Sequence, residues 1–201
     1  VFYQVATASC SDFRQSAIQN PQSKIEMAVL QRIRQFFVAS EVSPEAVVPA
    51  SATTYEVRPL TDKQLKEVWK LNQRCFTNGE DYPKSTLSYL LSATNALSYR
   101  AVTPKDEMVG FIFVTVQDGT AHLTTVGVAP EHRRRGLAQM LINHLEDALR
   151  QREINMICLE VRVNNFPAQN LYRQLDYAIM QRLIKYYNNG EDGFLMVKSL
   201  I

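Results

Sequence analysis

The chain has 201 residues, of which 46% are apolar, and a formal net charge of +2. This length predicts one folded domain with an appendage, and the near-balanced charge gives no general argument for nucleic-acid or membrane binding. No apolar run approaches the roughly 20 residues needed to cross a bilayer. Cys10, Cys75 and Cys158 are widely spaced and odd in number, which argues against a disulfide framework and favours a reducing compartment.

Residues 1–54 differ from the rest, and we expect them to form an N-terminal extension. Residues 22–40 predict one amphipathic helix, because apolar side chains recur there at three- and four-residue spacing. That stripe consists of Ile25, Val29, Ile33 and Phe36 or Phe37. Pro44 and Pro49 then indicate a linker, so we expect the main domain to span residues 55–201.

Strand and helix patterns alternate through the main domain. In chain order they predict a strand at 55–59, helices at 62–74 and 84–92, strands at 98–103, 108–117 and 120–129, a helix at 137–152, a strand at 156–163, a helix at 167–175, and strands at 177–186 and 194–198. Asp118-Gly119 and Asn189-Gly190 are turn signals between strands. This order predicts an α/β (α+β) fold, with a mixed central sheet of about seven strands flanked by helices on both faces.

The most informative segment is Arg133-Arg134-Arg135-Gly136-Leu137-Ala138, which follows an apolar strand and opens the helix predicted from residue 137. A helix N-terminus offers unpaired N–H groups and the positive end of the helix dipole. Gly136 lets backbone amides approach an anion closely, and the arginines add positive charge. We predict a diphosphate site for a phosphate-bearing cofactor here. An ordinary helix start with a solvated basic turn is the alternative.

Arg133-x-x-Gly136-x-Ala138, after Val126-Gly127-Val128, resembles the acetyl-CoA signature of the GCN5-related N-acetyltransferases, the GNAT family. The resemblance implies the GNAT fold and acetyl-CoA as cosubstrate, with no metal. The cofactor contacts that it implies in this region are Val126, Gly127, Val128, Arg133, Arg134, Arg135, Gly136, Leu137 and Ala138.

A second segment, Asn165 followed by Leu171-Tyr172 and Leu175-Asp176-Tyr177, resembles the closing segment of the same family. The resemblance implies that Asn165 reaches the cofactor and that Tyr172 faces the thioester sulfur. The family usually has Gly where Asp176 stands, but Asp tolerates positive φ better than most residues. The alternative for Tyr172 is an ordinary core tyrosine.

The tail carries Tyr186-Tyr187 and then Gly190-Glu191-Asp192, which resembles the ending of RimI-like and NatA-type protein N-terminal acetyltransferases. In that group the tyrosine-bearing hairpin closes over the substrate peptide, which implies Tyr186 and Tyr187 as substrate contacts. Gly79-Glu80-Asp81-Tyr82 resembles the acidic substrate loop of the NatA type and adds Glu80 and Tyr82. A polar hairpin with exposed aromatic side chains is the alternative.

The candidate base follows from strand alternation, which puts Cys158, Glu160 and Arg162 on one face of the strand predicted at 156–163. The resemblance implies Glu160 as the general base and His122, on the neighbouring strand, as a relay. A salt bridge of Glu160 with Arg162 or with a lysine of the next strand is the alternative, as is a structural role for His122. We expect no acyl-enzyme at Cys158, because no Cys–His pair is indicated.

The expected function is transfer of an acetyl group from acetyl-CoA to a primary amine, namely the N-terminal α-amino group of a protein. The amine attacks directly in a ternary complex, backbone N–H groups near Val126–Val128 polarise the carbonyl, and Tyr172 protonates the departing thiolate or donates a hydrogen bond to it. A small-molecule amine acetyltransferase and a non-catalytic acyl-CoA-binding regulatory module are the alternatives.

The expected partner is a protein or peptide N-terminus, with the ribosome or a ribosomal protein as a candidate and without nucleic acid or membrane. We expect a monomer or weak dimer in the cytoplasm. Because the chain begins with Val1, an organelle stroma or matrix is the alternative compartment, after removal of a transit peptide.

Overall fold

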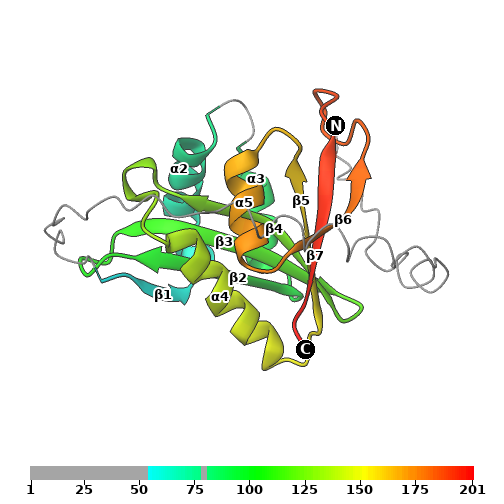
Figure 1. The fold of residues 1–201 in the computed structure, drawn as a ribbon. Coiled ribbons are helices and arrows are strands. Elements are labelled where there is room, and N and C mark those ends of the chain that lie inside the picture. The colour runs from blue at the N-terminus through cyan, green and yellow to red at the C-terminus, as the bar shows by residue number, and fades with distance from the viewer. Residues whose placement is uncertain (1–53, 78–80) are drawn as a thin grey trace, which may run out of the picture. The chain divides into compact units, whose positions relative to one another are not determined.

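The computed structural model describes residues 54–77 and 81–201, which form a seven-stranded sheet flanked by helices (Figure 1). The strands are β1 (Glu56–Pro59), β2 (Ala96–Val102), β3 (Met108–Gln117), β4 (Thr120–Val128), β5 (Met156–Arg162), β6 (Ala178–Leu183) and β7 (Gly193–Ser199). The helices are α2 (Leu65–Cys75), α3 (Lys84–Ser92), α4 (Leu137–Arg150) and α5 (Phe166–Gln174), with short 3-10 helices η3 (Asp62–Gln64) and η4 (Pro130–His132).

The strand order is β1-β2-β3-β4-β5-β7-β6. Every neighbouring pair is antiparallel except β4 and β5, which are parallel. The sheet is therefore mixed, and the predicted seven-stranded α/β architecture is confirmed.

Helices α2 and α4 pack on opposite faces of the sheet. Gly110 and Gly127 lie on the paired strands β3 and β4, and their vacant Cβ positions identify the two faces. A Cβ on Gly110 would contact Leu141 of α4, whereas a Cβ on Gly127 would contact Cys75 of α2. The ribbon agrees, with α4 and α5 crossing in front of the strands in this view (Figure 1).

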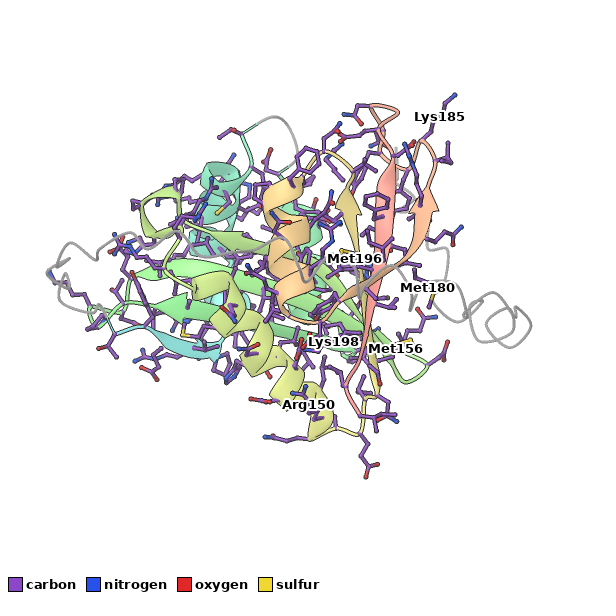
Figure 2. The ribbon with its side chains drawn as sticks, viewed as in Figure 1. Arg150, Met156, Met180, Lys185, Met196 and Lys198 are labelled. Atoms are coloured by element: carbon purple, nitrogen blue, oxygen red, sulfur yellow. The ribbon has the colours of Figure 1, made fainter. Side chains whose placement is uncertain are left out.

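The apolar stripe of α4 and a buried ion pair anchor this helix on the sheet. Leu141, Leu145 and Leu149 are fully buried, and the nearly buried Glu146 accepts from the Lys198 ammonium of β7 at 2.6 Å. Figure 2 shows Lys198 on β7 and Arg150 near the end of α4. These contacts fix the position of the helix whose N-terminus carries the predicted cofactor loop.

The predicted helix at 84–92 and strand at 108–117 are confirmed to the residue. The strand predicted at 177–186 is wrong at its end, because β6 stops at Leu183. Lys185 adopts a left-handed φ of 49°, and its N–H donates to Asp192 Oδ1 at 2.7 Å. The chain turns there, so Tyr186 and Tyr187 lie in the connection to β7.

The predicted N-terminal extension, with its helix at 22–40 and linker, lies outside the described residues, and the domain division at residue 54 stays a prediction. In the part of the chain that the structure describes, no helix is long and apolar enough to span a bilayer.

Candidate active site

The predicted cofactor loop connects the end of β4 to the start of α4. Gly136 is the N-cap of α4 and has a φ of 77°, in the left-handed region that glycine adopts without strain. No side chain caps this helix end, so the N–H groups of its first turn and the positive end of its dipole are available to an anion. The backbone thus has the form predicted for a diphosphate site, and each individual cofactor contact stays a prediction.

The three adjacent arginines of this loop have different surroundings. Arg133 donates to the carbonyls of Val128 and Cys75, at 3.2 and 3.0 Å. Arg135 donates to the Tyr55 hydroxyl and to the carbonyl of Glu131, both at 3.1 Å. The exposed Arg134 makes no hydrogen bond or ion pair with the described residues. Arg134 is therefore the arginine whose donors remain available for phosphate oxygens.

Strands β4 and β5 part beside this loop. Their pairing runs from Thr120 with Met156 to His122 with Cys158, and it ends there. Two residues after His122, Thr124 forms a bulge against β3, since Phe113 pairs with Thr125 and Val114 with Leu123. A bulge bends a strand and increases its twist. The backbone at Val126–Val128 is therefore not paired with β5, as its predicted role toward the thioester carbonyl requires.

The structure brings the two candidate proton-transfer residues together at this fork. His122 Nε2–H donates to Glu160 Oε2 at 2.6 Å, and the side chains are 36% and 19% exposed. Arg162, which the alternative pairs with Glu160, binds Glu191 at 2.8 Å. Glu160 and His122 therefore form a partly exposed pair, and their catalytic roles stay predictions.

Tyr82 and Tyr186 lie close enough to the Glu160 carboxylate to feel its charge. The Tyr82 hydroxyl lies 3.4 Å from the Thr124 carbonyl, and burial and the nearby Glu160 both raise its pKa. Burial and Glu160 likewise raise the pKa of Tyr186. Both phenols therefore stay protonated: the Tyr82 O–H donates to the Thr124 carbonyl, and the Tyr186 O–H can donate a hydrogen bond beside the carboxylate. A carboxylate among such donors and aromatic rings suits a primary amine, in its neutral or its ammonium form.

Tyr186 and Tyr187 are held against β7 at Gly193. A Cβ on this glycine would approach their rings to 3.4 and 3.3 Å. The Arg162 guanidinium stacks on the Tyr187 ring at 3.9 Å from its centroid, while Lys185 projects away from the domain (Figure 2). Tyr186 and Tyr187 therefore lie in a tyrosine-bearing turn between β6 and β7, and its closure over a peptide stays a prediction.

The α5 segment agrees with the backbone that the sequence predicts. The Asn165 side chain accepts from the Ala168 N–H at 3.2 Å and caps α5, which leaves its amide nitrogen for a cofactor. Asp176 has the expected positive φ, 66°. Tyr172 is only 6% exposed, its ring lies 5.6 Å from that of Tyr177, and burial raises its pKa. Its burial fits the alternative of a core tyrosine, and its role toward the sulfur stays a prediction.

The remaining candidates differ in how far the structure describes them. Glu80 lies outside the described residues. Cys75 and Asn72 of α2, which contact the cofactor loop and Tyr82 respectively, were not predicted as part of the site, and no local motif marks them. Within residues 54–77 and 81–201, no group of His, Cys, Asp and Glu side chains could hold a metal ion.

Comparisons with known proteins agree with this geometry. The acetyltransferase (GNAT) family model matches residues 65–177. The catalytic subunit of the N-terminal acetyltransferase B complex of Arabidopsis thaliana is 37% identical over 102 residues, which cover 48% of this chain and 59% of that subunit, less than two thirds of its length. An uncharacterised N-acetyltransferase of Methanocaldococcus jannaschii is 31% identical over 144 residues, which cover 71% of this chain and 90% of that protein.

Among solved structures, the ribosomal-protein-S18-alanine N-acetyltransferase from Escherichia coli matches with a TM-score of 0.68 and 25% identity. The match covers 73% of this chain and 94% of that chain. The family match includes both the cofactor loop and α5, so the local features predicted from the sequence lie inside the shared fold. The chain belongs to the acetyltransferase (GNAT) family.

Proposed function

We propose that this protein transfers an acetyl group from acetyl-CoA to the N-terminal α-amino group of a protein or peptide. The observation that carries the proposal is the Glu160–His122 pair, at 2.6 Å, placed where β4 and β5 part and lined by Tyr82 and Tyr186. The relatives named as N-terminal and ribosomal-protein acetyltransferases support this substrate class.

The chemistry requires a neutral amine, an electrophilic carbonyl and a stabilised thiolate. A free α-amino group has a pKa of about 8, so a base need only assist near neutral pH. In the proposed reaction, Glu160 accepts one proton from the ammonium, directly or through water, and the neutral amine attacks the thioester carbonyl. The C–S bond of the tetrahedral intermediate then breaks, and the second proton that the nitrogen loses restores the Tyr172 phenol. Backbone N–H groups near Val126–Val128 polarise the carbonyl, and Tyr172 donates its proton to the leaving thiolate.

The residues fit acetyl-CoA as the cosubstrate. The N-terminus of α4 and the Arg134 side chain would hold the diphosphate, and Asn165 would contact the pantetheine arm. We further propose that the substrate is a ribosomal protein N-terminus or a comparable one, and that the protein acts as a monomer or weak dimer in the cytoplasm or in an organelle stroma or matrix.

The decisive experiment offers acetyl-CoA and three kinds of amine: peptides with a free N-terminus, the same peptides blocked at the N-terminus but carrying an internal lysine, and small amines such as polyamines and amino acids. We expect acetylation at the N-terminus of the free peptides, located by tandem mass spectrometry. Preferential acetylation of the small amines would show a small-molecule acetyltransferase. Acetyl-CoA binding without transfer to any amine would show a non-catalytic module.

A further inference from the structure

The last turn of α2 is tied to the cofactor loop by side-chain contacts. Arg133 donates to the carbonyl of Cys75, the last residue of α2, and to the carbonyl of Val128, the last residue of β4. Arg74, also in the last turn of α2, forms an ion pair with Glu131 of η4. The final carbonyls of a helix lack intrahelical partners and carry the negative end of its dipole. A guanidinium between Cys75 and Val128 is therefore a C-terminal cap that reaches across to the sheet.

Packing strengthens the same link. A Cβ on Gly127 would lie 3.2 Å from Cys75 Sγ and still closer to the Phe111 ring, so the thiol and this ring together cover the backbone of β4 at Gly127. Burial raises the pKa of this thiol to about 11. The end of α2 thus rests on the strand segment that is proposed to face the thioester.

The contacts continue from α2 to the amine side of the site, which consists of Tyr82, His122, Glu160 and Tyr186. Asn72, which is fully buried in the last turn of α2, donates from Nδ2 to the carbonyl of Tyr82 at 3.0 Å. The Tyr82 hydroxyl lies at Thr124 and beside the Glu160 carboxylate. These contacts therefore join the cofactor loop to Tyr82 and, through its hydroxyl, to Thr124 at the fork between β4 and β5.

We infer that Arg133 is a positioning residue that couples acetyl-CoA binding to the amine side of the site through the last turn of α2, whereas Arg134 supplies charge to the phosphates. The identity of the two ligands rests on the proposed function. Coupling between two sites is reciprocal, and it is lost when the physical link between them is removed. Removing the Arg133 guanidinium should then weaken the effect of one ligand on the other and leave acetyl-CoA affinity nearly unchanged.

Trp69 provides a direct reporter for this link. It is the only tryptophan of the chain, it lies on α2, and the Lys84 ammonium sits 5.8 Å from its ring centroid. Acetyl-CoA would be titrated into wild type, Arg133→Met, Arg133→Lys and Arg134→Met, with tryptophan emission and calorimetry measured on the same samples. If acetyl-CoA binding moves the C-terminal end of α2, the tryptophan emission of Trp69 in the wild-type protein should change.

The two methionine variants should then behave in opposite ways. Arg133→Met should bind acetyl-CoA within about threefold of wild type but lose the Trp69 response, and Arg133→Lys, which keeps the charge, should restore part of it. Arg134→Met should bind acetyl-CoA about tenfold more weakly and keep the full emission change once saturated. An unaltered response in Arg133→Met, no response in wild type, or equal losses of acetyl-CoA affinity in Arg133→Met and Arg134→Met would overturn the inference.

Steady-state kinetics gives a second readout with the best peptide substrate. Arg133→Met should raise the peptide KM by about five- to fiftyfold with little change in the acetyl-CoA KM, and Arg134→Met should do the reverse. An unchanged peptide KM in a folded Arg133→Met protein would contradict the coupling. If wild type acetylates no amine, the proposed function fails, but the emission titration with acetyl-CoA alone still tests the role of Arg133.

Discussion

The cofactor side and the amine side of the site are built in different ways. The cofactor side is one continuous stretch, residues 126–138, and its key property is a backbone conformation, the left-handed Gly136 at the start of α4. The amine side is assembled from Tyr82, His122, Glu160 and Tyr186, which come from four separate parts of the chain. Substitutions on the cofactor side should therefore lower acetyl-CoA affinity, and substitutions on the amine side should lower kcat.

The largest effect is expected on the amine side, for Glu160→Gln. This change keeps the shape of the side chain and removes the charge that accepts the amine proton. We expect kcat to fall by about 10²- to 10⁴-fold and to recover partly at high pH, where more of the substrate amine is neutral without assistance. His122→Ala should give a smaller loss in the same direction, because His122 acts through Glu160.

Rates measured over roughly pH 6 to 10, which brackets the α-amine pKa, would test this prediction. Glu191→Gln is the matched control, since its carboxylate is paired with Arg162 two residues after Glu160 and lies outside the proposed proton path. Its pH profile should keep the shape of wild type. If the profiles of all four proteins coincide, neither Glu160 nor His122 is the base.

On the cofactor side, Gly136→Asp should give the second largest effect. The substitution places a negative charge where the diphosphate is proposed to bind and forces a side chain into a positive φ. We expect acetyl-CoA affinity, measured by calorimetry, to fall by about two or more decades. Gly119→Asp is the matched control, because Gly119 has nearly the same φ, 74°, and equally open surroundings in the turn between β3 and β4. Equal cofactor affinity in the two folded variants would show that the loop does not bind the phosphates.

The same contrast explains which parts of the site could be predicted from the sequence. The cofactor loop was predictable because its geometry depends on local signals, a glycine, a strand before it and a helix after it. The partner of Glu160 was only partly predictable. Strand alternation indicates the face on which Glu160 lies, but the register between β4 and β5 decides that His122 meets it.

Long-range contacts account for what the sequence could not show. Three adjacent arginines look equivalent in the sequence, yet Arg133 is held by a carbonyl of Cys75, 58 residues earlier. The apolar pattern predicts a strand through Tyr186, but the strand ends before a hydrogen bond from the Lys185 N–H to Asp192. No local sequence pattern indicates this hydrogen bond. The strand propensity of the residues after Leu183 was overridden there, because the Lys185 N–H donates to the Asp192 side chain across the turn.

Tyr172 lies between the two sides, and Tyr172→Phe should have an intermediate effect. Burial raises its pKa, so its phenol stays protonated across the usual assay range and can donate as the sulfur departs. We expect kcat to fall about ten- to a thousandfold with little change in the acetyl-CoA KM. Tyr177→Phe is the matched control, because the neighbouring Tyr177 ring packs against Tyr172, while its hydroxyl interacts with Glu146 of α4 and has no role in the proposed reaction. Equal kcat values for both variants, when chemistry limits the rate, would remove Tyr172 from the mechanism.

The smallest effect is expected when the charge of Asp192 is removed. This carboxylate stabilises the tyrosine-bearing turn on the amine side of the site. The Lys185 N–H and the Arg182 guanidinium lower the pKa of this carboxyl from its ordinary value of 3.8. Because the folded pKa is the lower one, the stabilisation is fully present above about pH 4 and is lost as the pH falls through the folded pKa. Asp192→Asn keeps an acceptor for Lys185 and removes the charge. Hydrogen exchange at the Lys185 amide should therefore be faster in the variant than in wild type at neutral pH, after correction for intrinsic rates, and this ratio should shrink toward one below pH 4. A ratio that stays constant over the whole range would mean that the Asp192 charge does not hold the turn.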